Sequence, residues 1–295
     1  MARFIMAGPL QAGIFVIFMT FVTALAPPLA VLGNAAIALV TLRSGWQKGV
    51  VLAIVASITL GLLFSAQNSL GQGLAIGLLQ WLPIVGFAWI LFRTVSWSIT
   101  LQAIMGTIIF GLVIFQILIP DIATYWTSTL TSLFEPLKGK EEFSAIDIKQ
   151  QIETLAPHMT WLSAASFTVI SVVSLLIGRY WQAKLYNPGG FGEEFRAITV
   201  GKPAAFVVIA LTTAALLSDH VLIQAMLMAG MIVFLFHGLG LAHSLVHAGK
   251  IHKGLLFLMY FLMFILPVMI LVMLATLAII DSFADFRSKL DIDKP

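Results

Sequence analysis

Long apolar runs follow one another along the whole chain, separated mostly by short polar connections. The 295 residues are 60% hydrophobic and 10% charged, whereas about 25% of the residues in an ordinary soluble domain are charged. A segment in hydrocarbon must satisfy its own backbone hydrogen bonds, which an α-helix does within one run. The sequence therefore predicts an all-α polytopic membrane protein.

We predict about nine transmembrane helices in a single integral membrane domain, residues 1–295. The predicted spans are 11–26, 29–42, 50–65, 74–92, 98–119, 161–177, 203–217, 221–246 and 254–280. Pro27 and Pro28 separate the first two spans because neither can donate to the preceding turn. Pro267 is expected to kink the ninth span without ending it. If the first two segments form one bent helix, the count falls to eight and the N-terminus changes sides.

The longest polar interval, residues 121–157, is predicted to form two short amphipathic helices that lie in the membrane interface. One apolar face has helical spacing: Ile122, Tyr125, Trp126, Leu130, Leu133, Phe134 and Leu137. Ser144 and Asp147 have capping-box spacing, and Ile148, Ile152 and Leu155 give the second helix, which Pro157 is expected to end.

The distribution of basic residues predicts the orientation, because Lys and Arg accumulate in cytoplasmic connections. With a cytoplasmic N-terminus, only Glu193 and Glu194 oppose the basic residues of the inner side. These are Arg3, Arg43, Lys48, Arg93, Arg179, Lys184, Arg196, Lys202, Lys250 and Lys253. The sequence thus predicts a cytoplasmic loop at 179–202, a periplasmic interval at 121–157 and an outer C-terminal tail.

The sequence favours no enzymatic chemistry. The absence of cysteine excludes disulfides and thiolate sites, and the chain has neither a metalloprotease HExxH pairing nor a serine nucleophile motif. His243 and His247 have a spacing that could hold a metal, but no acidic residue lies near enough in the sequence to complete the site. We expect no metal, no cofactor and no nucleic-acid partner.

Polar residues within the predicted spans have two interpretations, which are hydrogen bonding between helices and the lining of a ligand cavity. They are Asn34, Gln80, Gln102, Gln116, Gln224 and His237, together with several Ser and Thr. Small residues such as Gly73 and Gly77 have the spacing that allows close helix contact, and we interpret them as sites of internal packing.

Residues 179–198, RYWQAKLYNPGGFGEEFRAI, form the most distinctive polar stretch. Its Asn-Pro-Gly-Gly sequence predicts a turn, because proline fixes φ and glycine tolerates positive φ. Either this stretch is an interfacial anchor followed by a turn, or it binds a ligand or docks a partner. The candidate residues are Arg179, Tyr180, Trp181, Tyr186, Asn187, Pro188, Gly189, Gly190, Phe191, Glu194, Arg196 and His243.

This stretch resembles the signature loop of the YybS-like family of bacterial integral membrane proteins, and GLGLAHSLVHAGK resembles a second segment of that family. The resemblance implies a bacterial inner-membrane protein whose biochemical activity is uncharacterised. It also implies a distant similarity to the substrate-binding S components of energy-coupling-factor transporters and to the scaffold protein MreD.

Two functions follow as hypotheses. The first is a non-enzymatic small-molecule binding or transport protein that resembles an S component, with a vitamin-like or lipid-like ligand in a cavity reached from beneath the 121–157 interval. The second is a cell-envelope interaction or scaffold protein that recruits a cytoplasmic protein through residues 179–198. The lipid bilayer is a partner in both hypotheses.

Overall fold

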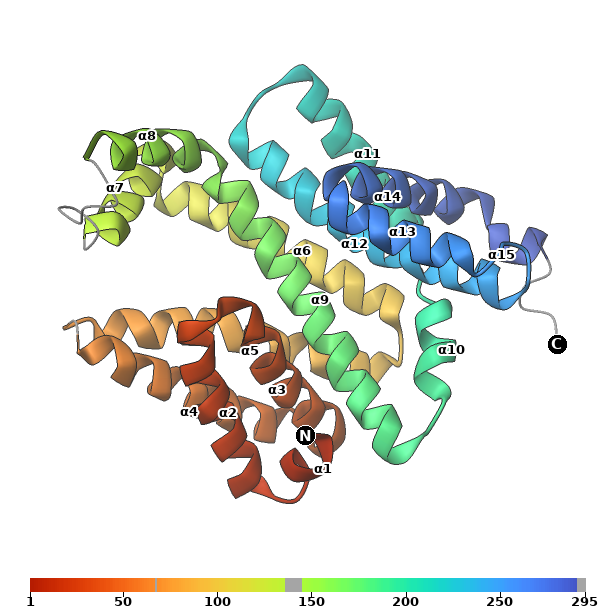
Figure 1. Ribbon diagram of the computed structural model, residues 1–295, viewed down its shortest axis with the longest axis horizontal. Coiled ribbons are helices and arrows are strands. Elements are labelled where there is room, and N and C mark those ends of the chain that lie inside the picture. The colour runs from red at the N-terminus through yellow and green to blue at the C-terminus, as the bar shows by residue number, and fades with distance from the viewer. Residues whose placement is uncertain (67, 136–144, 291–295) are drawn as a thin grey trace.

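The computed structural model describes residues 1–66, 68–135 and 145–290, and within these ranges the chain is helical with no strand (Figure 1). The helices are α1 (Ala2–Ile5), α2 (Pro9–Leu25), α3 (Ala30–Ser44), α4 (Trp46–Ser65), α5 (Leu70–Thr94), α6 (Trp97–Leu118), α7 (Ile122–Phe134), α8 (Ala145–Leu155), α9 (Met159–Tyr186), α10 (Gly190–Arg196), α11 (Lys202–Leu217), α12 (Val221–His247), α13 (Gly254–Ile265), α14 (Pro267–Ala284) and α15 (Phe286–Lys289). Two 3₁₀ turns, Pro27–Leu29 and Ala156–His158, precede α3 and α9.

Seven helical segments of the described chain are long and apolar enough to cross a membrane. They contain α3, α4, α5, α6, α9, α12 and α14, whereas α2, α11 and α13 are shorter apolar helices. The chain is therefore an all-α, multi-pass membrane protein. The predicted spans at α2 and α11 coincide with two of the three shorter helices.

Two hydrophobic cores divide the molecule, and α9 runs between them (Figure 1). Helices α1 to α5 build the first core, and α3, α5, α6, α9 and α11 to α14 build the second. Gly178 allows α9 to approach α3, because a Cβ at this position would lie 3.0 Å from the Ala35 carbonyl oxygen and from the Ala38 Cβ. A larger residue would separate the two helices.

The predicted separation of the first two helical segments is confirmed. Helix α2 ends at Leu25, and the 3₁₀ turn at Pro27–Leu29 leads into α3. A Cβ added to Gly33 of α3 would lie 3.2 Å from the Cβ of Met19 in α2. The two helices thus pack against each other as a hairpin, which rules out a single bent helix.

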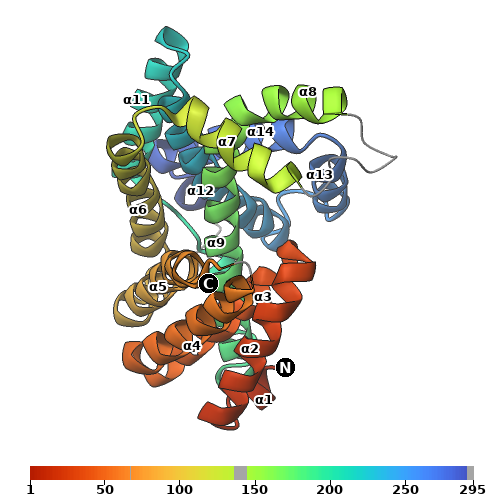
Figure 2. The ribbon, with the colours of Figure 1, turned by 90° about the vertical axis from the view of Figure 1, so that its left-hand side faces the viewer.

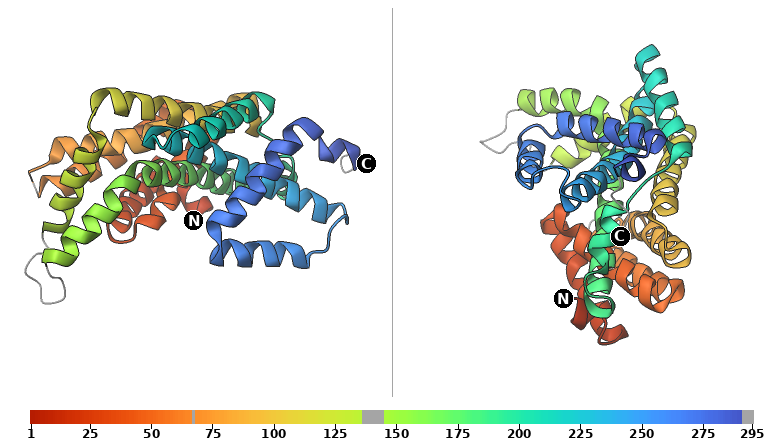
Figure 3. Two further views of the ribbon diagram at one scale, coloured as in Figure 1. Left: turned by 90° about the horizontal axis from the view of Figure 1, so that it is seen from above. Right: turned by 90° about the vertical axis from the view of Figure 1, so that its right-hand side faces the viewer.

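The prediction that 254–280 forms one kinked span is wrong. Helix α13 ends at Ile265, Leu266 has the non-helical angles φ −126° and ψ 59°, and α14 begins at Pro267. Proline lacks an N–H and disfavours the helical conformation of the residue before it. The two helices form a V, and α14 runs back toward the end at which α13 began (Figure 3).

Helices α7 and α8 form a layer at one end of the bundle, as the amphipathic pattern predicts (Figure 2). Leu130 of α7 packs with Ile148 and Ile152 of α8 in a small separate core. Leu133 of the predicted apolar face is 69% exposed and does not join this small core. Leu137 and Ser144 of the predicted pattern, and the side chain of Asp147, lie outside the described part. Pro157 ends α8 through a 3₁₀ turn that continues directly into α9.

Helix α15 lies at the same end as residues 190–202, which corrects the predicted place of this part of the tail on the opposite side. Arg287 Nη2 donates to the carbonyl oxygens of Arg196 at 3.2 Å and Ile198 at 3.1 Å. The return of α14 through the V accounts for the difference, because the predicted ninth span would have carried the tail across. Arg287 and Lys289 therefore join the basic residues of this end. Within the described residues, Lys149 is the one Lys or Arg at the other end.

Candidate functional site

The polar stretch folds into the end of α9, an exposed turn, the short helix α10 and an extended connection to α11. Gly189 has φ +96°, a conformation that favours glycine. The turn brings α10 back against α9, so that Glu194 accepts hydrogen bonds from Arg179 Nε at 2.8 Å and Nη2 at 2.6 Å. This bidentate geometry makes the ion pair more directional than a single hydrogen bond.

The same ion pair is connected to α3. Arg179 Nη1 donates to the side-chain oxygen of Gln182, whose amide nitrogen donates to the carbonyl oxygen of Leu42 at 3.1 Å. One turn further along α9, the guanidinium of Arg43 lies 4.2 Å from the centre of the Tyr186 ring. These contacts join the C-terminal ends of α3 and α9.

Aromatic rings connect α10 to α9 and to α12. Phe191 packs edge-on against Tyr180, with ring centres 5.5 Å apart, and Phe195 packs edge-on against His243 of α12 at 5.2 Å. His243 Nδ1 lies 3.0 Å from the Leu239 carbonyl oxygen, and Nε2 lies 3.5 Å from the Tyr260 hydroxyl. The ring is thus held by contacts within the protein.

The extended connection after α10 supplies backbone carbonyl groups to α6 and α15, and α10 itself packs closely against α12. Val200 accepts hydrogen bonds from Ser98 Oγ at 2.8 Å and from Gln102 Nε2 at 2.7 Å, both on α6. Ile198 accepts from Arg287 of α15, and a Cβ on Gly240 of α12 would lie 2.8 Å from the Phe195 carbonyl oxygen. Residues 179–202 therefore brace the helix ends on both sides of α9.

The structure brings together only some of the candidate residues. Arg179, Tyr180, Phe191 and Glu194 lie in contact, and His243 joins them through Phe195. Trp181 packs with the first core instead. The turn residues Asn187, Pro188 and Gly189 are exposed, Gly190 is half-buried beside them, and Tyr186 lies under Arg43. Arg196 contributes its carbonyl oxygen to Arg287.

A buried charged cluster at the end of α14 was not predicted. Asp281 Oδ2 accepts hydrogen bonds from His237 Nε2 at 2.8 Å and from Arg287 Nη1 at 3.0 Å. Its Oδ1 accepts from the backbone N–H of Phe286 at 2.8 Å. The side chains of His237 and Asp281 are 1% and 3% exposed, and His237 Nδ1 has no hydrogen-bond partner within the described residues. We refer to Asp281, His237 and Arg287 as the buried triad.

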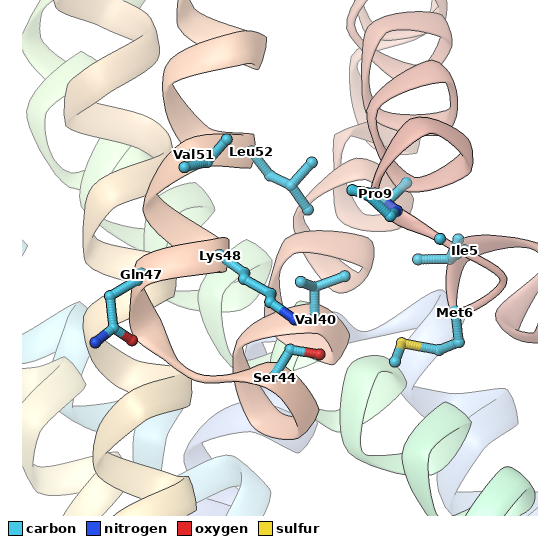
Figure 4. Close-up of a pocket in the computed structure, with 11 residues that line it drawn as sticks. Ile5, Met6, Pro9, Val40, Ser44, Gln47, Lys48, Val51 and Leu52 are labelled. Carbon is cyan, nitrogen blue, oxygen red and sulfur yellow. The ribbon is translucent and has the colours of Figure 1, made fainter.

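A pocket of about 360 Å³ lies between α1, α2, α3 and α4, at the end of the bundle that carries residues 179–202 (Figure 4). Its lining is mostly apolar, with Ser44, Gln47 and Lys48 as the polar side chains: Ile5, Met6, Gly8, Pro9, Ala12, Val40, Ser44, Gln47, Lys48, Val51 and Leu52. The Lys48 ammonium group points across the pocket toward Ser44, whereas the Gln47 amide points away (Figure 4). Sequence analysis missed this pocket because its walls come from four helices.

Among the described residues, no three His, Asp or Glu side chains are grouped so as to hold a metal ion. Comparisons of the chain with protein-family models, with curated proteins and with solved structures give no match. The case for a function therefore rests on the geometry of the chain itself.

Proposed function

We propose that the protein is a non-enzymatic membrane protein that binds a small molecule in the pocket between α1 and α4, in the manner of the binding subunit of a transporter. The observation that carries this proposal is the pocket itself. A volume of about 360 Å³ lies at the lower end of the range for small-molecule sites, and an apolar lining with few polar groups is typical of such sites.

The walls of the pocket suggest that a ligand enters from the bilayer. Val51 is 59% exposed, and Leu10, next to the lining residue Pro9, is 71% exposed. Apolar side chains exposed on membrane helices face lipid, so the rim is continuous with the hydrocarbon region. The deeper wall is formed by Ile5, Val40 and Leu52, which are buried. The pocket lies at the end opposite α7 and α8, so a cavity beneath the 121–157 interval is not part of this proposal.

A pocket-filling variant tests the proposal. Leu52→Trp would fill the deeper wall, whereas Ile54→Trp would place the same ring on an outward-facing position that is 43% exposed. Native mass spectrometry of gently purified protein should show one retained small molecule in the parent chain and in Ile54→Trp, and none in Leu52→Trp. Equal retention in all three proteins, or bulk phospholipid alone in all three, would refute binding at this pocket.

A second candidate, docking of a cytoplasmic protein, is favoured by the exposure of the turn at Asn187–Gly189. Tyr186, beside this turn, is 47% exposed, whereas Phe191 is half-buried against Tyr180. A photocrosslinker at Tyr186 should capture one defined protein in cells, and a crosslinker at Phe191 should capture much less. Capture of lipid alone at Tyr186 would count against docking and for a purely anchoring turn.

A further inference from the structure

We infer that the ligand of this pocket is a single-chain amphiphile with an anionic head, either a carboxylate or a phosphate monoester. The head lies at Lys48 and the aliphatic tail lies against Ile5, Val40 and Leu52. This inference rests on the proposed function, and it specifies the chemical class of the ligand.

Lys48 is exposed, and its charge has no counter-ion among the described residues. The described residues contain no carboxylate within ion-pairing distance of its ammonium group. The side chain nevertheless extends across an apolar pocket toward Ser44 (Figure 4). A cation at the edge of such a surface favours an anion that also carries an apolar portion, because the anionic group then pairs with the cation and the apolar portion packs against the apolar lining.

The start of α4 adds to this preference. Helix α4 begins at Trp46, and its N-cap, Gly45, has no side chain to accept a hydrogen bond from the first turn. The first N–H groups of a helix have no partner within the helix, and the helix dipole favours negative charge at this end. Gln47 and Lys48 of this first turn line the pocket. The dipole of α4 and the charge of Lys48 therefore both favour a negatively charged group in this part of the pocket.

Position and size restrict the ligand further. The pocket lies at the end of the bundle where nearly all the basic residues of the described chain gather. This is the level at which anionic groups meet a membrane protein that follows the positive-inside pattern. A volume of about 360 Å³ suits one short chain better than the two chains of a phospholipid, since it lies near the lower limit for small-molecule sites.

Three probes with the same tail test the inference. Dodecanoate, dodecyl phosphate and dodecanol are titrated into delipidated protein held in nanodiscs of neutral phosphatidylcholine. The parent chain should bind at least one of the two anions about tenfold or more tightly than the alcohol, which is the size expected for a hydrogen bond to a charged group. The anion bound more tightly identifies the head group as a free fatty acid or as a phosphate.

Substitutions at Lys48 separate charge from shape. Lys48→Gln should abolish the preference for the anions and leave dodecanol binding unchanged, and Lys48→Arg should retain the preference. Unchanged circular dichroism and elution volume serve as controls for folding. If the parent chain binds dodecanol as tightly as both anions, or if Lys48→Gln keeps the preference, the inference is wrong.

The pocket-filling variant separates this inference from the proposed function. Leu52→Trp should abolish binding of all three probes, and Ile54→Trp should bind them as the parent chain does. Binding that Leu52→Trp abolishes but that shows no preference for an anion would leave the pocket as a binding site and refute the anionic head. Binding that Leu52→Trp does not affect would refute the pocket itself.

Discussion

Removal of the Asp281 carboxylate should destabilise the protein more than any other single loss of a charge at this end of the bundle. Asp281 accepts hydrogen bonds from His237, Arg287 and the backbone N–H of Phe286. In Asp281→Ala the Arg287 guanidinium loses its ion pair with Asp281 at 3.0 Å, and the Arg287 side chain is 7% exposed. Removal of one member of a buried ion pair is costly because water cannot replace the lost contact.

The expected loss is about 3–5 kcal/mol, the usual cost of removing one member of a buried ion pair. Arg287→Met should also cost several kcal/mol, because it removes the ion-pair partner of Asp281 and the donor to the carbonyl oxygens of Arg196 and Ile198. The double variant should lose less than the sum of the two single losses, with a coupling of about 1–3 kcal/mol. The same interaction is removed in each single variant, so it cannot be lost twice.

Equilibrium unfolding in mixed micelles, followed by tryptophan fluorescence and circular dichroism, measures these losses. Asp285→Asn is the matched control, since it removes an exposed carboxylate from the same segment. Asparagine tolerates the positive φ of this position, 49°, and is as good an N-cap as aspartate. A loss below about 1 kcal/mol for Asp281→Ala, or additive losses in the double variant, would refute our account of the buried triad.

Three further outcomes are expected. Gly73→Ala should destabilise the protein by about 1–3 kcal/mol, because the new Cβ would lie 2.8 Å from backbone atoms of α4. Gly71→Ala is the control and should be nearly neutral, because its new Cβ would meet nothing within 4 Å. Equal unfolding midpoints for the two variants would contradict this expectation. Arg179→Lys should weaken the bidentate contact with Glu194 and speed proteolysis at the 187–189 turn, whereas an unchanged cleavage rate would show that the ion pair does not hold α10. The Asp121 carboxylate accepts a hydrogen bond from the first turn of α7, which lowers its pKa below the ordinary value. Its stabilisation of α7 should therefore be present above the unfolded pKa of about 3.9 and should disappear as the pH falls. This pH dependence, measured by hydrogen exchange of α7, should be absent in Asp121→Asn, and its persistence in that variant would argue against the cap.

Much of the helical framework could be predicted from the sequence, because length and hydropathy are local properties of each apolar run. The interpretation of Gly73 and Gly77 as packing residues is confirmed, since an added Cβ at either would clash with α4. The break at Leu266 could not be predicted in the same way. A proline in a membrane helix either kinks it or ends it, and the choice depends on what the neighbouring helices contact.

The candidate site could be predicted only as a set of residues. The place of Arg179 and Glu194 in a polar stretch makes them candidates, but their pairing depends on the turn that returns α10 to α9. The buried triad joins residues 44 positions apart in the chain, and hydropathy placed Asp281 just beyond the predicted ninth span. The available signal was an aspartate directly after an apolar run, followed by an arginine in the same short segment.

The V of α13 and α14 has a consequence for how the protein enters its membrane. A V that enters the hydrocarbon region from one face and returns to that face would not require the basic side chains of Arg287 and Lys289 to cross the bilayer. Helices α13 and α14 could then insert together from one face after the other helices are in place. Helices α1 and α15 lie at the same end of the bundle, so reporter domains fused ahead of α1 and after α15 should share one compartment.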